Sequence, residues 1–403
     1  MHATPVQDFR ESGPRLLRLD PLLLVATVAL VAASVYVVRT ATGTDVPGEP
    51  NHYLYRQLAY AGVGLALMLL LSRFDYSRLR DWKFGVYGVL IVSILLVYAF
   101  GFSARGSQRA IELGAVNFQA SELGKLLLVV ALSAFVVDRM RRLDDRETTS
   151  RVVLLALIPA MLVIAQPDLG SGLVYLAIVL AVLFVAGTKW THFAALAGLG
   201  VAAVAIVVVA APAVGVEVLK PYQMDRLTAF LNPSTDPEQE KEGYQINQSL
   251  TAIGSGGKTG RGDESTQTKL DFLPEHHTDF IFSVVGEEFG FVGAALVLSL
   301  FALLIWRALK ILTMSKNLYG ALVAGGITAM LMFQVFVNVG MTIGIMPITG
   351  IPLPLMSYGG SSVLTTLMAI GLLQSIHAQA RETAARKPSD HSRPSRLFPA
   401  GGL

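Results

Sequence analysis

The sequence contains no cysteine, and only 15% of its 403 residues are charged. The lack of cysteine excludes disulfides, thiolate catalysis and cysteine metal sites. The low charge, together with a hydrophobic share of 53% and a mean hydropathy of +0.55, excludes an ordinary soluble domain. The chain is therefore expected to be an integral membrane protein, and nucleic acid is not an expected partner.

Long apolar runs recur along the chain, most of them close to the roughly 20 residues that a helix needs to cross a bilayer. They predict an all-α, polytopic fold with about ten transmembrane helices. The expected spans are residues 20–40, 56–73, 84–101, 118–138, 151–166, 170–187, 191–212, 279–306, 318–345 and 358–378. These spans form one transmembrane domain, residues 20–378, between a tail at 1–19 and a polar, Pro-containing tail at 379–403 that is expected to be disordered.

Arginine and lysine gather in the connections that follow even-numbered spans, for example Arg139, Arg141 and Arg142 after the fourth. By the positive-inside rule, both termini are expected in the cytoplasm. The first span lacks a small-residue cleavage site and is expected to be retained. The opposite face then carries a long segment, residues 213–278, between spans seven and eight. A polar segment of this length is usually functional or disordered.

Three short stretches place ionisable residues where a membrane makes them costly. In "FQASELGK", Glu122 and Lys125 lie three residues apart and so share a helical face. They form either a structural ion pair or the polar floor of a substrate cavity. In "QPDLGSG", Asp168 is placed to cap a helix.

The third stretch, "LPEHHTDFIF", crowds His276, His277 and Asp279 against the start of the eighth span, and Glu287 and Glu288 follow. Asp279 is expected at the N-cap position, but capping does not explain its ionisable neighbours. Adjacent histidines are expected to face different ways, and no H-E-x-x-H spacing exists, so the pattern disfavours zinc. A metal requirement is left unknown.

Basic residues on the outer face run against the usual charge bias and indicate an anionic ligand such as a pyrophosphate or an acidic lipid. Arg56 heads the second span, where it also has the option of snorkelling. Ser357 is placed to cap the final span. The residues expected to bind substrate or pyrophosphate are Arg105, Arg109, Lys258, Arg261, His277 and Ser357.

The sequence resembles the SEDS family of shape, elongation, division and sporulation proteins in the content and order of these stretches and of "GYQINQSLTAIGSGGKTGRG" and "MPITGIPLPLMSYGGSS". It resembles the elongation (RodA) branch of the family more than the division (FtsW) branch. The resemblance implies a peptidoglycan glycosyltransferase that polymerises lipid II at the outer face of the bacterial cytoplasmic membrane. It implies as partners a class B penicillin-binding protein, which crosslinks the glycan, and the elongation machinery. By motif match, Asp279 is the catalytic residue, supported by a polar cavity with Arg56, Glu122, Lys125 and Asp168.

The sequence departs from the family pattern at Ala110, at Ala120 and in a shortened "GRGDESTQTKLDF", but not at Asp279. The implied reaction is an inverting displacement of undecaprenyl pyrophosphate, which needs a base at the attacking hydroxyl and positive charge at the phosphates. The basic residues above or a divalent cation such as Mg²⁺ or Mn²⁺ would supply that charge. The alternatives are a lipid II flippase lined by Glu122, Lys125 and Asp168, a division-type polymerase, and a non-catalytic scaffold that would tolerate Asp279→Asn.

Overall fold

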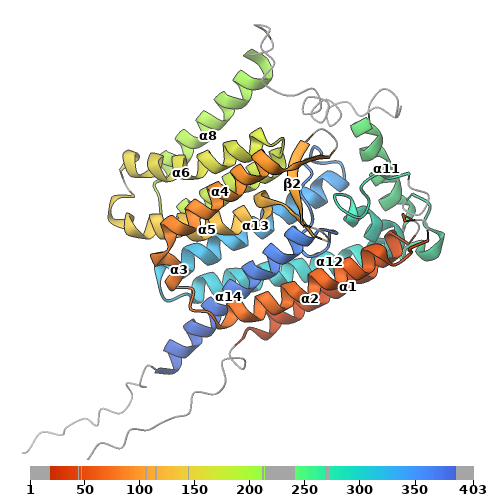
Figure 1. Cartoon of the computed structure of the whole chain (residues 1–403), viewed down its shortest axis with the longest axis horizontal. Helices are drawn as coiled ribbons and strands as arrows, with labels where there is room; N and C mark the ends of the chain where they lie inside the picture. The colour runs from red at the N-terminus through yellow and green to blue at the C-terminus, as the bar shows by residue number, and fades with distance from the viewer. Residues whose placement is uncertain are drawn as a thin grey trace, which may run out of the picture.

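The computed structural model describes residues 19–43, 45–46, 48–104, 107–113, 116–143, 145–210, 213, 241–267 and 272–386. In this part of the chain the helices run along an elongated bundle (Figure 1), which confirms the predicted all-α, multi-pass architecture. Nine described helices are long and apolar enough to cross a membrane, and a shorter apolar helix makes the tenth expected span. Residues 214–240 and 268–271 of the long 213–278 segment lie outside the described residues, as do the tails 1–18 and 387–403.

The ten apolar helices match the ten predicted runs, with shifted ends. They are α1 (Pro21–Ala41), α2 (His52–Arg73), α4 (Lys83–Phe100), α5 (Ala120–Asp138), α6 (Arg146–Ala165), the short α7 (Leu169–Val185), α8 (Trp190–Ala205), α12 (Ile281–Met314), α13 (Leu318–Thr342) and α14 (Gly360–Arg386). Helix α14 continues eight residues past the predicted end at 378. Minor elements are α3 (Arg78–Asp81), η2 (Met140–Arg142), η3 (Ile206–Ala210), α11 (Lys241–Ser255) and η4 (Gly262–Glu264).

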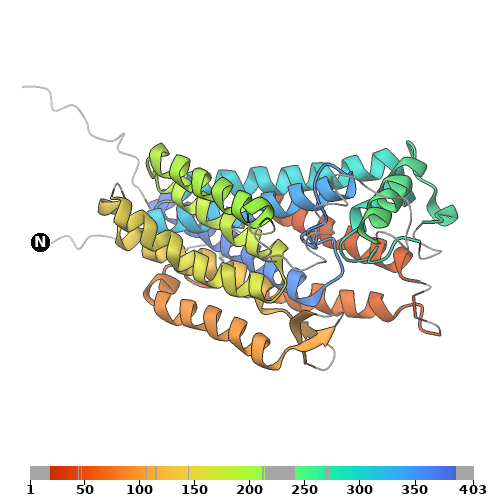
Figure 2. The ribbon, with the colours of Figure 1, turned by 90° about the horizontal axis from the view of Figure 1, so that it is seen from above.

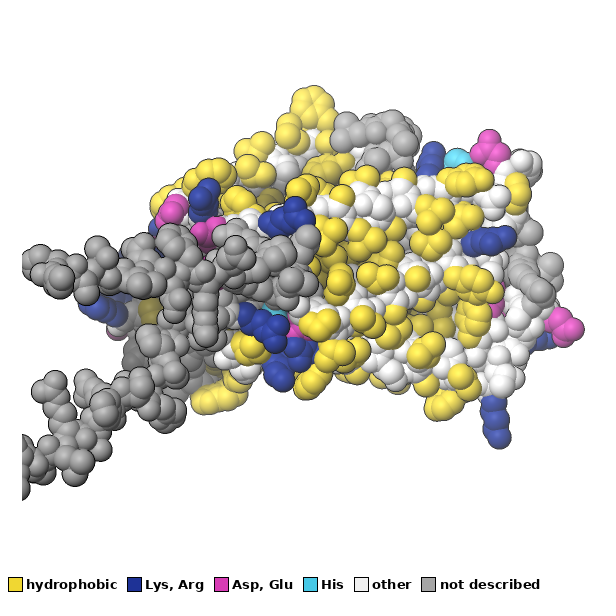
Figure 3. Space-filling view, turned by 90° about the horizontal axis from the view of Figure 1, so that it is seen from below, with side chains coloured by type: hydrophobic (Ala, Val, Ile, Leu, Met, Phe, Trp, Pro, Cys, Tyr) yellow, Lys and Arg dark blue, Asp and Glu magenta, His cyan; other side chains and the backbone are white. Residues whose placement is uncertain are grey.

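Helices α5, α13 and α14 lie at the centre of the bundle, as the burial of most of their residues shows. Helix α8 lies at the edge, and most of its residues are exposed (Figure 1). Helix α2 packs along α14, and α12 packs between α1 and α13. On one face of the molecule, hydrophobic side chains cover the middle while charged ones lie toward the two ends (Figure 3). That distribution is the one a bilayer requires of a spanning bundle.

One end of the bundle carries a small antiparallel sheet of β1 (Phe102–Ala104), β2 (Ser107–Leu113) and β3 (Val116–Phe118), in the order β1-β2-β3. The apolar runs of the sequence predicted only a connection between the third and fourth spans here. Helix α11 and the end of α1 lie at the same end, and the start of α1 and the end of α14 lie at the other (Figures 1 and 2). The sheet and α11 are therefore on the side opposite the first helix's start.

Helix α12 is kinked at Gly290, whose φ of 61° is left-handed. The glycine-rich 256–267 loop packs against α12 around this kink. A Cβ at Gly256 would lie 1.9 Å from the Gly286 carbonyl oxygen, and a Cβ at Gly260 would lie 2.1 Å from the Glu288 carbonyl oxygen. Only glycine allows this approach. The glycines that the sequence singled out thus dock the loop on α12.

Candidate functional site

Asp279 lies in a turn that spans residues 273–280, and helix α12 begins only at Ile281. Phe280 occupies the N-cap position, without a side-chain capping bond. The expectation that Asp279 caps the eighth span is therefore wrong. Its side chain is half-buried in an irregular turn, so a structural duty as helix cap does not account for this carboxylate.

Three successive carbonyl groups of this turn are held from two other segments. The Tyr358 backbone N–H donates to the His277 oxygen (2.9 Å), the Ser357 hydroxyl donates to the Thr278 oxygen (2.6 Å), and the Asn338 side-chain amide donates to the Asp279 oxygen (2.9 Å). Buried carbonyls need partners. Here those partners fix the backbone on both sides of the Asp279 side chain.

The same donors also fix the Pro-rich segment that precedes α14. Asn338 donates a second bond from Nδ2 to the Ile351 oxygen (2.8 Å). The Ser357 hydroxyl accepts from the Leu353 N–H (2.8 Å). Since α14 begins at Gly360, the expectation that Ser357 caps this helix is wrong: its hydroxyl joins the Pro-rich segment to the Asp279 turn.

Helix α2 supplies an aromatic wall beside the turn. The Tyr53 ring lies 4.9 Å from the His277 ring and 5.0 Å from the Tyr358 ring, and Tyr60 lies 6.2 Å from Tyr358. Arg56 is half-buried on the same helix, close enough to Tyr53 and Tyr60 for its charge to act on both phenols. The structure therefore brings Arg56 to the wall that His277 contacts.

Glu122 and Lys125 form the predicted ion pair, with Nζ and Oε1 2.6 Å apart and both side chains almost fully buried. Asp168 caps α7 as predicted, accepting from the Ser171 N–H (3.0 Å). Its second oxygen accepts from the Ser121 hydroxyl (2.7 Å). The cap thus also ties α7 to the first turn of α5, next to the buried pair.

Glu287 and Glu288 hold neighbouring segments at the kink of α12. Glu287 Oε1 accepts from the N–H groups of Thr266 (2.7 Å) and Gln267 (2.9 Å), and Glu288 Oε2 accepts from the Thr40 hydroxyl (2.6 Å). These carboxylates anchor the glycine-rich loop and the end of α1. Their role in the described structure is to position segments around the turn.

Of the six residues predicted to bind substrate or pyrophosphate, His277 and Ser357 lie at the Asp279 turn. Lys258 and Arg261 are exposed on the glycine-rich loop. Arg109 lies on β2, and Arg105 lies outside the described residues. The assignment of these four basic residues to pyrophosphate stays a prediction.

The two histidines before Asp279 both approach Asp45, just beyond α1. His276 Nε2 lies 3.5 Å and His277 Nδ1 lies 3.6 Å from the same carboxylate oxygen. The expectation that adjacent histidines face different ways is wrong here, because the segment is a turn and not a strand or helix.

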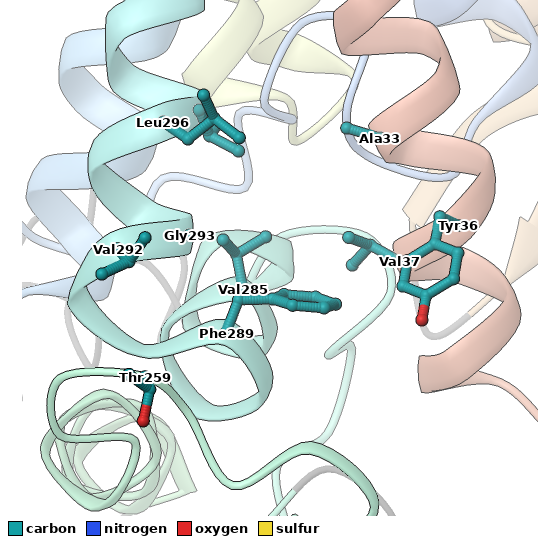
Figure 4. A pocket seen from close by; sticks show the side chains of 10 residues that line it. Ala33, Tyr36, Val37, Thr259, Val285, Phe289, Val292, Gly293 and Leu296 are labelled. Carbon is teal, nitrogen blue, oxygen red and sulfur yellow. The ribbon is translucent and has the colours of Figure 1, made fainter.

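An apolar cavity of about 390 Å³ opens between α1 and α12, next to the glycine-rich loop (Figure 4). Tyr36 and Phe289 face each other across it with ring centroids 5.8 Å apart. Val37, Val285, Val292 and Leu296 line the remainder, with Thr259 at the loop side (Figure 4). The Thr40–Glu288 hydrogen bond lies within one helical turn of the aromatic pair. The cavity suits a hydrocarbon chain.

Several residues at the site went unnoticed in the sequence. Asn338 is a buried amide near the C-terminal end of an apolar span. Burying a polar side chain within a span costs free energy, so its presence there was a usable signal in the sequence. Ser121 and Tyr358 stood inside motifs already singled out. Asp45 carried no local pattern, because only the fold brings it to the histidines.

The family of FtsW, RodA and SpoVE, described as cell cycle proteins, matches residues 17–382. The chain is 37% identical to the peptidoglycan glycosyltransferase MrdB of Escherichia coli K12 (90% of this chain, 94% of the relative). It is 36% identical to a probable peptidoglycan glycosyltransferase FtsW of Thioalkalivibrio sulfidiphilus (95% and 96%).

Two solved structures share the fold. One is a chain from a study of how a peptidoglycan synthase complex coordinates polymerization and crosslinking; its TM-score is 0.75 at 34% identity, over 90% of this chain and 98% of that one. The other is the rod shape determining protein RodA of Thermus thermophilus, with a TM-score of 0.65 at 32% identity, over 91% and 99%.

Proposed function

The chain belongs to the SEDS family of FtsW, RodA and SpoVE proteins and is a peptidoglycan glycosyltransferase, and we propose that it polymerises lipid II with Asp279 as the general base. The observation that carries this role is the clamp on three consecutive carbonyls around Asp279. A general base contributes most to the reaction rate when its position is fixed before the substrate binds.

In the proposed reaction, the Asp279 carboxylate accepts the proton of an attacking sugar hydroxyl. The oxygen attacks the anomeric carbon of the other substrate from the face opposite its phosphate, so an α linkage becomes a β linkage and undecaprenyl pyrophosphate departs. Pyrophosphate is a good leaving group, so no second carboxylic acid is required. Arg56, on the aromatic wall beside the turn, is a candidate for stabilising the departing charge.

The polyprenyl chain needs an apolar path to this site, and the cavity between α1 and α12 is the proposed path. Its lining is almost wholly hydrocarbon and aromatic (Figure 4). Thr259 of the glycine-rich loop lines one side of it, and the Thr40–Glu288 bond lies within one helical turn of its aromatic pair. A tail held there would leave its pyrophosphate at the end of the bundle that carries the turn.

The setting of the reaction is also proposed. We place the turn, the sheet and α11 at the outer face of the bacterial cytoplasmic membrane, with both termini in the cytoplasm, because of the distribution of basic residues. A class B penicillin-binding protein is the proposed partner, supported by the similarity to a chain of a peptidoglycan synthase complex. A role in elongation rests on the "TGIPLPLMSYGGSS" and "GYQINQSLTAIGSGG" motifs.

The test compares wild type, Asp279→Asn and Glu275→Gln in liposomes with purified lipid II and the candidate partner. Glu275 is a matched control because it is another half-buried carboxylate of the same turn. Glycan polymer from wild type and the control, but not from Asp279→Asn, is the expected result. Equal polymer from all three proteins would reject Asp279 as the base.

The flippase reading is tested in the same liposomes. It predicts that wild type moves lipid II between leaflets without making polymer, and that changes at Glu122, Lys125 or Asp168 stop the movement. The described structure favours chemistry, because these three residues are engaged in an ion pair and a helix cap. A scaffold would give neither polymer nor transport and would tolerate Asp279→Asn in cells.

A further inference from the structure

The geometry points to a zinc site formed by Asp45, His276 and His277, which would fasten the end of α1 to the turn that carries Asp279. The ligand atoms of these three residues all lie within 4.8 Å of one another. Two imidazoles and a carboxylate are donors that zinc accepts readily. The inference concerns metal binding by this trio and does not depend on the proposed general base.

The spacing of the ligand atoms fits a metal better than direct hydrogen bonds. The Asp45 oxygen lies 3.5 Å from His276 Nε2 and 3.6 Å from His277 Nδ1, both longer than ordinary hydrogen bonds. Ligands about 2.1 Å from a tetrahedral zinc ion lie roughly 3.4 Å from each other. The two measured separations are close to two edges of that tetrahedron.

The surroundings of His276 point the same way. Its Nδ1 lies 3.0 Å from the Leu273 carbonyl oxygen, and its Nε2 lies 3.2 Å from the Ala41 carbonyl oxygen. A neutral imidazole carries only one N–H and cannot donate to both carbonyls. With Nδ1–H donating to Leu273, as metal-binding histidines usually do with a backbone carbonyl, Nε2 directs its lone pair toward two oxygens. A cation between them resolves that conflict.

Burial sets the site apart from surface acidic clusters. The His276 side chain is 3% exposed and that of Asp45 is 16% exposed. The His277 ring also contacts the Tyr53 ring, with centroids 4.9 Å apart. The Ala41 carbonyl oxygen, 3.2 Å from His276 Nε2, or a water molecule from solvent would complete four-coordination. Nitrogen donors favour zinc over magnesium, which prefers oxygen.

The site would join segments far apart in sequence. Asp45 follows α1, whereas His276 and His277 directly precede Thr278 and Asp279. Bound zinc would therefore hold the turn from the α1 side, while Asn338 and Ser357 hold it from the other. Its effect would be on the stability and order of the turn.

The experiment uses the full chain in detergent, purified without a histidine tag and stripped with a chelator. Zinc binding is measured by calorimetry, Co²⁺ by the visible absorption of tetrahedral cobalt, and stability by thermal unfolding. We expect one zinc per chain and a rise in Tm, with affinity falling at least about 10-fold in Asp45→Asn and in His276→Ala. His52→Ala is the matched control, since His52 pairs with Glu49 outside the trio, and it should bind like wild type.

Asp45→Asn keeps the size of the side chain, so it tests the site even if His276→Ala fails to fold. Wild type that binds no more zinc than these variants, or binds it without a tetrahedral cobalt spectrum, would overturn the inference. In that case the trio would be an ion pair between Asp45 and a protonated histidine.

Discussion

The side-chain amide of Asn338, near the C-terminal end of α13, donates a 2.9 Å hydrogen bond to the carbonyl oxygen of Asp279. The bond joins a rigid helix of the bundle to the turn that carries the proposed base. Asn338 also donates to the Ile351 oxygen (2.8 Å), so one buried amide positions two irregular segments. The clamp explains how a carboxylate outside any helix is kept in place.

Asn338→Ala should leave the protein folded but lower polymerisation. Loss of the amide frees the Asp279 carbonyl, and a displacement of about 1 Å at a catalytic group costs on the order of 100-fold in rate. Turnover on lipid II by purified variants is the measurement. Gln334→Ala, a buried amide one turn earlier on α13, is the control and should keep near wild-type turnover. Wild-type turnover in both variants would mean that the Asn338 hydrogen bond is not needed for polymerisation.

The docking of the glycine-rich loop gives a second prediction. Gly256→Ala would place a Cβ 1.9 Å from the Gly286 carbonyl oxygen, whereas a Cβ at Gly254 meets nothing within 4 Å. Overpacking of this kind costs about 1–3 kcal/mol. Thermal unfolding in detergent should therefore show a lower Tm for Gly256→Ala and an unchanged or higher one for Gly254→Ala. Matching Tm values would argue against the close contact with α12.

Variants of the buried Glu122–Lys125 pair of α5 test whether the pair has a structural or a functional role. Lys125→Met alone should cost about 3–5 kcal/mol because it leaves the Glu122 charge uncompensated, while adding Glu122→Leu should restore much of the stability. If the double variant is stable and still polymerises lipid II, the pair is structural. If it is stable and inactive, the pair supports the substrate cavity.

At the opposite end of the bundle, Arg307 Nε donates to both oxygens of Asp20 (3.1 and 3.0 Å), the residue before the first spanning helix. Burial raises the pKa of Asp20, but the Arg307 and Leu23 hydrogen bonds outweigh it and the net pKa is lowered. A lowered folded-state pKa means that Asp20 stabilises the fold above its unfolded pKa of about 3.9.

That contribution is lost as the pH falls through the lower, folded-state value. Asp20→Asn should lower Tm at pH 7 and show a smaller further loss than wild type on acidification below about pH 4. Thermal unfolding at several pH values measures both effects. A parallel loss of Tm in the two proteins on acidification would rule out Asp20 as a source of the acid sensitivity.

The sequence correctly predicted the structural features that depend on residues close together in the chain. Ten apolar runs gave ten helices, the spacing of Glu122 and Lys125 gave their ion pair, and the Asp168 turn gave a helix cap. It failed where tertiary contacts replace local rules. The sequence gives Asp279 the position of a helix cap, but in the structure Phe280 is the N-cap and Asn338 holds the Asp279 carbonyl within the turn.

The three-stranded sheet and the meeting of Asp45 with the histidines also escaped prediction. The strands at 102–118 are short and lack a clear alternation, so local pattern does not distinguish them from a loop. Asp45 is separated from His276 by more than half of the chain. No periodicity connects residues at that distance, and only the packing of α1 against α12 brings them together.

The most direct measurement separates lipid II binding from turnover in Asp279→Asn. A general base contributes about 100- to 10,000-fold to the rate and little to the affinity for the ground state. We therefore predict an unchanged Kd for lipid II with turnover reduced by at least 100-fold. A variant that loses binding and turnover in proportion, or that keeps its turnover, would contradict the assignment of Asp279 as the catalytic base.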